Sequence, residues 1–206
     1  MTQLVVVSGK GGVGKSAAAA ATALVAHRRD ARVLVLSMVG TGGGLATHIG
    51  AGVLRFEPVE VFPGLHALSV DRSRALMEYL RVQVGLPAFT TLPPVMRAFD
   101  ALTSAAPAVR EIVTLGKVLW EVRRDRWDVV VADGPPTGQI GSFLRAPATI
   151  GELVTGGRIA EQAGWMAETL RSHDTLLRLV TLPEELPASE TQETLDWLDR
   201  YLGPVR

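Results

Sequence analysis

Cysteine is absent from the sequence, and so is any excess of charge of one sign. Without cysteine the chain forms neither disulfides nor thiolate metal sites, and catalysis by a cysteine nucleophile is excluded. Lysine and arginine together number 21, as do aspartate and glutamate, so the formal net charge is zero. A neutral chain lacks the broad electrostatic attraction toward nucleic acids and anionic membranes. We therefore predict no nucleic acid partner.

Long hydrophobic runs are also missing. No apolar stretch reaches the roughly 20 residues that a helix needs to span a bilayer, so we predict no integral membrane segment. The short apolar run over residues 3–7 has no basic region before it, unlike a secretory signal peptide. We therefore expect a cytoplasmic protein. Its 206 residues are enough for one α/β domain with a sizeable core.

Glycine, in contrast, is concentrated in a loop near the N-terminus. Residues 3–7 are rich in valine without polar alternation, which predicts a strand buried on both faces, and residues 16–27 are strong helix formers. The loop between them, Gly9 to Ser16, fits G-x-x-x-x-G-K-[ST], the P-loop pattern. Its backbone N–H groups and the helix N-terminus suit phosphates, with Lys15 on the β- and γ-phosphates and the Ser16 hydroxyl on Mg²⁺.

A second candidate site residue, Asp133, ends a predicted strand over residues 127–133. In an open α/β sheet, ligands bind at the carboxyl ends of the strands. A carboxylate there, close to a P-loop, can hold Mg²⁺ directly or through water. The alternative is an aspartate that only starts a turn, since Gly134 and Pro135 follow it.

Strands alternate with helices along the chain, which predicts an α/β fold with a mainly parallel sheet and right-handed crossovers. Further strands are predicted over residues 32–37, 65–70 and 176–182, and a glycine-rich loop at residues 40–44. Helices are predicted after Asp71, near 94–103, after Pro107 and at about 188–202. We predict one domain over residues 1–206, with a helical insertion at about 71–126.

These motifs resemble a known family. Lys10–Ser16 looks like the deviant Walker A motif of the MinD/ParA/ArsA superclass of P-loop ATPases. Asp133–Gly138, with Leu144–Pro147 beyond it, resembles switch II of ArsA-type anion-transporting ATPases and of the related ATPase that targets tail-anchored membrane proteins. Pro183–Leu186 and Ser189–Thr191 resemble a later segment of the same branch. The resemblance implies a three-layer P-loop NTPase sandwich, with the helical insertion between switch I and switch II.

The resemblance also implies cofactors, partners and residue roles. ATP with Mg²⁺ is the implied ligand, held by Gly11, Gly12, Val13, Gly14, Lys15, Ser16 and Ala17, with Ser16 and Asp133 as metal ligands. The implied catalytic residues are Lys10, Lys15 and Asp133. In this superclass the early lysine, here Lys10, reaches the partner's nucleotide across a dimer interface. The implied assembly is a homodimer or a heterodimer with a related ATPase.

Three features depart from the family pattern. The family's switch I supplies an aspartate that orients the attacking water, but no acid lies between Asp30 and Glu57. The absence of cysteine removes the thiols of the arsenite site and of the zinc clasp, so we expect no arsenite transport. The chain ends after a predicted helix, where the family continues into another strand, so we expect the C-terminal end of the family domain to be missing.

Several functions are compatible with this pattern. We favour an ATP-binding and ATP-hydrolysing dimeric switch that couples its nucleotide state to a partner or an apolar protein client. The glycine-interrupted apolar segment 141–166 is a candidate client groove, although ordinary core packing explains most of its residues. The main alternative is a hydrolysis-deficient nucleotide-binding subunit of a heterodimer. A MinD-like membrane organiser would need a basic C-terminal helix, and a P-loop small-molecule kinase would not explain the switch II resemblance.

Overall fold

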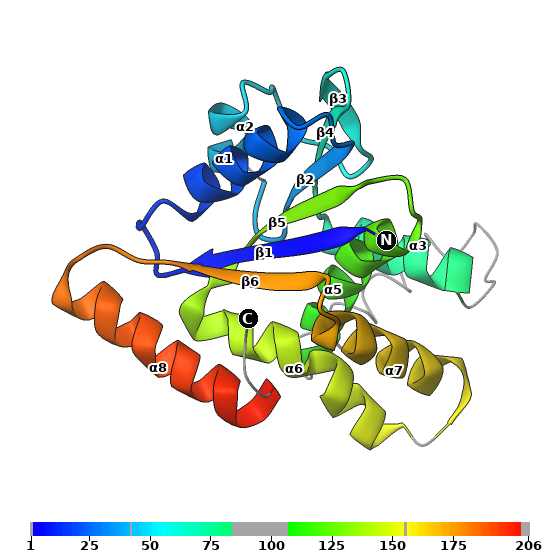
Figure 1. Cartoon of the computed structure of the whole chain (residues 1–206). Helices are drawn as coiled ribbons and strands as arrows, with labels where there is room; N and C mark the ends of the chain where they lie inside the picture. Colours follow the sequence, from blue (N-terminus) through cyan, green and yellow to red (C-terminus); the bar gives the residue numbers. More distant parts are fainter. Residues whose placement is uncertain (1, 42, 84–106, 155, 203–206) are drawn as a thin grey trace.

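The computed structural model describes residues 2–41, 43–83, 107–154 and 156–202, and they form a six-stranded sheet between two layers of helices (Figure 1). The strands are β1 (Gln3–Gly9), β2 (Val33–Ser37), β3 (Val59–Phe62), β4 (Leu65–Ser69), β5 (Val129–Pro136) and β6 (Thr175–Val180). Their spatial order is β3-β4-β2-β5-β1-β6. Only the pair β3–β4 is antiparallel, so the predicted mainly parallel sheet is confirmed for the described residues.

The register of the central strands gathers the predicted site residues at one edge of the sheet. Val7 of β1 and Ser37 of β2 both lie opposite Asp133 of β5. The P-loop follows β1 directly, so it leaves the sheet beside Asp133. This is the edge formed by the carboxyl ends of the strands, where an open α/β sheet binds its ligands.

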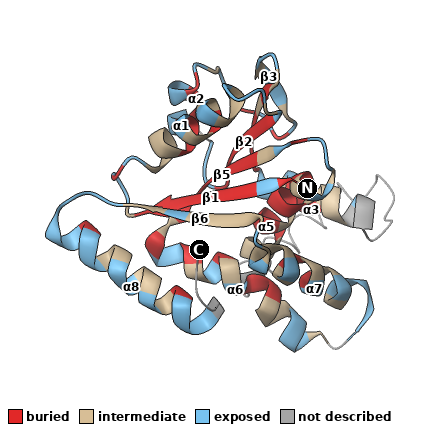
Figure 2. Cartoon of the chain, viewed as in Figure 1, coloured by how far each residue is buried: buried red, intermediate tan, exposed pale blue. Residues whose placement is uncertain are grey.

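Helices cover both faces of the sheet. On one face lie α1 (Lys15–His27) and α2 (Gly43–His48); on the other lie α3 (Arg72–Gln83), α5 (Pro107–Arg123), α6 (Thr137–Leu153), α7 (Gly157–Arg171) and α8 (Glu185–Leu202). Val5 and Val7 of β1 pack toward α1, whereas Leu4 and Val6 pack toward the α5 and α6 side. The buried strands therefore form the middle layer of a three-layer sandwich, with exposed helix surfaces outside it (Figure 2).

The structure differs from the sequence expectations in several elements. Gly43 and Gly44, predicted to end a glycine-rich loop at residues 40–44, instead begin the short helix α2, and the edge strand β3 was not predicted. Strand β5 continues through Gly134 to Pro136 instead of ending at Asp133. Helix α8 begins at Glu185, three residues before the predicted start, because Pro187 is tolerated in a first helical turn. The helix predicted near 94–103 lies outside the described residues.

A buried ionic cluster connects the first and last described parts of the predicted insertion. Lys117 of α5 lies 2.9 Å from Glu121 in the same helix and 2.9 Å from Glu78 of α3. The Trp127 indole N–H donates to Glu121 over 3.3 Å, and the Lys117 ammonium lies 4.4 Å from the centre of the Phe56 ring. These contacts satisfy the buried charges and hold α3 against α5. Within the described residues, none of the helices is long and apolar enough to cross a membrane.

Candidate nucleotide-binding site

The loop between β1 and α1 turns on glycines at positive φ. Gly12 has φ 85° and Gly14, the N-cap of α1, has φ 92°, values that strain any residue with a side chain. Gly9 is required for a second reason: a Cβ there would lie 2.2 Å from the Val180 carbonyl oxygen. The backbone thus passes close to β6 and then enters α1 at Lys15, which leaves the helix N-terminus facing the loop.

The predicted nucleotide-binding residues 11–17 follow one another around this turn. Gly11, Gly12 and Gly14 are exposed, while Val13 is buried and fixes the loop to the core. The Lys15 ammonium donates to the Lys10 carbonyl oxygen over 3.0 Å, so its side chain folds back along the loop. Exposed glycines, a helix N-terminus and an ammonium group thus lie together along one short loop, and this combination is suited to phosphates.

Ser16 and Asp133 meet across the edge of the sheet. The Ser16 hydroxyl donates to Asp133 Oδ2 over 2.6 Å, which brings together the two predicted metal ligands. Burial raises the pKa of Asp133, whereas the Ser16 hydrogen bond and the charges of Lys15 and His48 act to lower it. Two oxygen donors beside a phosphate site fit Mg²⁺, which is held by few protein ligands and by substrate phosphates. The described residues contain no cluster of three or more acidic or histidine side chains that could hold a metal.

The loop after β2 lies against the same site but supplies no carboxylate. Ser37 Oγ donates to the Val39 carbonyl over 2.9 Å, and the Met38 N–H donates to the Asp133 carbonyl over 3.0 Å. A Cβ at Gly44 would lie 3.4 Å from Ser16 Oγ, so the first turn of α2 lies directly against Ser16. The position that a water-orienting aspartate would take therefore borders the P-loop, as the resemblance implies, but without the acid.

Lys10 has an intramolecular partner that sequence reasoning missed. Its ammonium lies 2.7 Å from the Glu190 carboxylate of α8, and the two side chains are 26% and 37% exposed. The two residues lie 180 positions apart. The segment Ser189–Thr191 had been noted for its resemblance to the family, but nothing in the local sequence indicates which residue its glutamate contacts.

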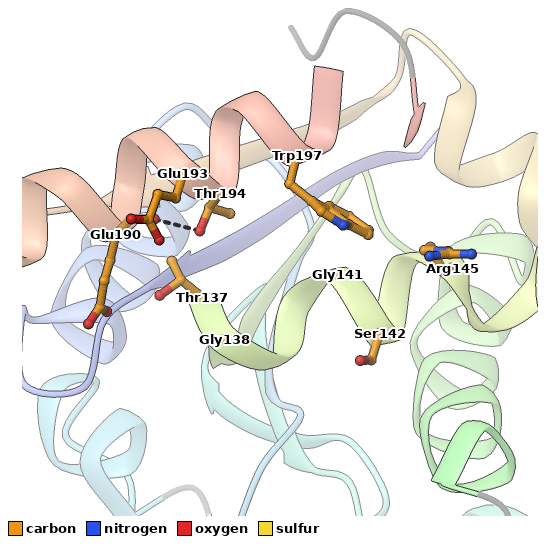
Figure 3. Close-up of a pocket in the computed structure, with 9 residues that line it drawn as sticks. All are labelled: Thr137, Gly138, Gly141, Ser142, Arg145, Glu190, Glu193, Thr194 and Trp197. Carbon is orange, nitrogen blue, oxygen red and sulfur yellow. Dashed lines mark hydrogen bonds between the residues drawn. The ribbon is translucent and has the colours of Figure 1, made fainter. Parts of the chain in front are cut away.

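A cleft of about 450 Å³ separates α6 from α8 beside this ion pair (Figure 3). It is lined by Thr137, Gly138, Gly141, Ser142, Arg145, Glu190, Glu193, Thr194 and Trp197. At its floor the helices touch, because a Cβ at Gly141 would lie 3.0 Å from the Trp197 ring. Thr194 Oγ1 donates to the Glu190 carbonyl over 2.7 Å, which steadies the helix turn that carries Glu190. The cleft thus lies between the helix after Asp133 and the helix that holds Lys10.

Part of the apolar segment 141–166 packs into the core. Phe143 and Met166 are 3% and 5% exposed, and they join the core cluster that also contains residues of α5 and α6. Leu153 and Ile159, on either side of the α6–α7 connection, are 73% and 48% exposed. Among the described residues of this segment, the large apolar side chains most open to a partner therefore lie at the α6–α7 end.

Comparisons with known proteins cover almost the whole chain. A sequence model of the family described as anion-transporting ATPases matches residues 2–202. ATPase BagA of Mycobacterium tuberculosis is 31% identical over 214 residues, which cover 98% of this chain and 63% of that protein. ATPase GET3 of Kluyveromyces lactis is 26% identical over 178 residues, covering 80% of this chain and 51% of GET3. The chain thus spans between half and two thirds of the length of these relatives.

Proposed function

Because the chain belongs to the family of ArsA-type anion-transporting ATPases, we propose that it binds ATP with Mg²⁺ and hydrolyses it as a dimeric molecular switch. The observation that carries the proposal is the 2.6 Å hydrogen bond between Ser16 and Asp133 at the mouth of the P-loop. It joins the residue that would bind Mg²⁺ from the P-loop to the one that would bind it from β5, as P-loop ATPases require.

Each part of the loop has a role in this proposal. The backbone N–H groups of residues 11–14 would bind the phosphates, and Lys15, which now donates to the Lys10 carbonyl, would bind the β- and γ-phosphates. Ser16 and Asp133 hold the metal through their oxygens. Mg²⁺, when bound, neutralises the charge that develops on the phosphate oxygens. Asp133 has to be ionised for this role, and the neighbouring Lys15 charge favours that form.

Lys10 is proposed to act on the nucleotide of the partner subunit. A cation placed against the phosphate charge that develops in the transition state acts like an arginine finger supplied in trans. The partner is a second copy of this chain or a related ATPase. ATP would then favour a closed dimer, and its hydrolysis would release that state.

The client would bind at a distance from the phosphates. Asp133 and α6 are continuous through the short stretch to Thr137, so a change at the metal site can move α6 and its exposed end. Leu153 and Ile159 at that end suit an apolar protein client. We propose that nucleotide state is coupled to a partner or client through this helix.

A second candidate function rests on the loop after β2. No acid lies between Asp30 and Glu57, and orientation of the attacking water carries much of the catalysis of phosphoryl transfer. A chain that binds ATP but does not orient water would act as the regulatory, hydrolysis-deficient subunit of a heterodimer. It would use the same P-loop, Ser16 and Asp133.

The deciding experiment measures ATP binding and Mg²⁺-dependent ATP turnover by the purified chain, with Lys15→Ala as the blank. Turnover above the blank supports the ATPase. Binding without turnover supports the regulatory subunit, and turnover should then appear on addition of an active related ATPase. Binding that is as strong in Lys15→Ala as in the wild type contradicts both. Asp133→Asn is the matched control, since it should retain ATP binding without metal and lose the response to Mg²⁺.

A further inference from the structure

We propose that Glu190 is a positioning residue that holds the Lys10 ammonium against α8, away from the partner's nucleotide, until the dimer closes. This inference rests on the proposed function, because it concerns how the lysine that would act in trans is kept and released. It adds to that function a residue for which the sequence indicates no role, and it assigns α8 a part in controlling the P-loop.

Lys10 and Glu190 belong to different kinds of element, a glycine-rich loop and a long helix. Lys10 is attached to a loop in which glycines stand at positions 9, 11, 12 and 14, and glycines leave a loop backbone free to change conformation. Glu190 stands on an 18-residue helix, and its turn is steadied by the Thr194 hydroxyl. Contact between Trp197 and Gly141 fixes that helix against α6. Glu190 is thus the fixed member of the pair, and Lys10 is the member that can move.

The Lys10–Glu190 ion pair is weak enough to form and break reversibly. Both partners are partly exposed, and such ion pairs bias an equilibrium by about two- to fivefold at moderate salt. A nucleotide polyphosphate with several negative charges is a stronger partner for an ammonium group than one carboxylate. Glu190 therefore delays the engagement of Lys10 without preventing it, and closure of the dimer breaks the pair.

Glu193 offers a matched comparison within the same helix. It lines the same cleft one turn beyond Glu190, and within the described part of the chain it forms no ion pair with Lys10. Replacing either glutamate with glutamine removes one negative charge from α8. Only the change at position 190 should free Lys10, so the pair of variants separates a specific contact from a general effect of charge.

Because the chain has few lysines, chemical labelling can report directly on the contact between Lys10 and Glu190. The sequence holds three lysines, Lys10, Lys15 and Lys117, and Lys117 is buried. We would acylate the nucleotide-free protein briefly and follow each lysine by mass spectrometry. Glu190→Gln should raise the labelling rate of Lys10 about two- to fivefold, whereas Glu193→Gln should leave it unchanged. In the wild type, 1 M NaCl should raise the rate toward that of Glu190→Gln, because salt screens the pair.

A second readout tests the release step. With a non-hydrolysable ATP analogue, Glu190→Gln should self-associate at a protein concentration about two- to fivefold below that of the wild type and of Glu193→Gln. Equal Lys10 labelling in all three proteins, unaffected by salt, overturns the inference, as does faster labelling with an unchanged association midpoint. A wild type that binds the analogue but never associates contradicts the proposed dimer instead, and the labelling then still decides whether Glu190 holds Lys10.

Discussion

Two lysine–glutamate pairs in this chain have the same chemistry but different surroundings. Lys10 and Glu190 join the P-loop to α8, and their side chains are 26% and 37% exposed. Lys117 and Glu121 stand one turn apart in α5, with exposures of 3% and 0%. The first pair is partly open to solvent. The second has protein on almost all sides, including the Phe56 ring and the indole of Trp127.

This difference determines what each pair can do. Removing one partner of a buried pair leaves a charge without water or a counter-ion, which is costly, so the Lys117–Glu121 pair remains formed. In an exposed pair, water replaces the lost partner at little cost, so the Lys10–Glu190 pair can open and close. The buried pair therefore fixes α3 and α5 in place, whereas the exposed pair is suited to a step in a nucleotide cycle.

The largest expected effect comes from Lys10→Ala. If the proposed role in trans is correct, ATP turnover should fall by about a thousandfold or more, since a finger-type cation contributes that much to phosphoryl transfer. The free energy of unfolding should change by about 1 kcal/mol or less, because only an exposed pair is lost. Steady-state turnover and guanidinium denaturation measure the two quantities. A large loss of stability with little loss of turnover would show that the Lys10–Glu190 pair is structural and that Lys10 does not act on a nucleotide.

The second effect is on stability alone. Glu121→Ala should lower the free energy of unfolding by about 3–5 kcal/mol, because it leaves the buried Lys117 ammonium with less compensation. Urea denaturation followed by circular dichroism gives the value. The double variant Lys117→Met with Glu121→Leu is the control, and it should recover only part of the loss, because Glu78 and the Trp127 N–H then lose their partners. A loss below about 1 kcal/mol in Glu121→Ala would show that water reaches this site.

A smaller effect is expected for the interaction between Lys10 and Glu190 itself. A double-mutant cycle on Lys10→Met and Glu190→Gln should give a coupling free energy of about 0.2–1 kcal/mol at low salt. The coupling should vanish at about 1 M NaCl, where the screening length is near 3 Å. Urea denaturation of the four proteins supplies the cycle. Coupling that persists in high salt would mean that the pair is shielded from solvent and is unsuited to release.

The smallest effect is expected from an exposed pair at the amino ends of the strands. The Arg32 side chain, whose own pKa is raised, donates two hydrogen bonds to Asp128, and the Arg32 backbone N–H donates a third. These bonds lower the pKa of Asp128 from 3.8 to about 2. The native state thus favours the ionised form, so the contribution is present above about pH 4 and is lost as the pH falls toward 2. Asp128→Asn should melt slightly below the wild type from pH 5 to 8, and the gap should close below pH 4. A gap that widens with acid would contradict this assignment.

Sequence reasoning succeeded where neighbouring residues carry the whole signal. The valine-rich run was identified in this way and forms β1, and β-sheet register then brings the predicted site residues Ser16 and Asp133 together. Helix α2 was missed because Gly43 and Gly44 disfavour a helix; burial of Leu45 stabilises it instead. Strand β3 is four residues long and lies between two prolines, which conceal a short edge strand.

Glu190 could not have been predicted from the sequence alone, because its partner lies 180 positions away. The charge spacing on α8 indicates only an acidic surface. The contact arises from the packing of α8 on α6, which places Glu190 near the P-loop. The roles assigned to Lys10, Lys15, Ser16 and Asp133 remain predictions about a bound nucleotide, and their geometry is compatible with it.

The contact between Gly141 and Trp197 has a consequence for how this sequence can vary. With a Cβ at position 141 only 3.0 Å from the indole, even alanine would require the Trp197 ring to shift by a few tenths of an ångström. Related sequences that carry a side chain at the position of Gly141 should therefore carry a smaller residue in place of Trp197. Positions 141 and 197 are thus expected to covary among related sequences, because together they set the spacing between α6 and α8.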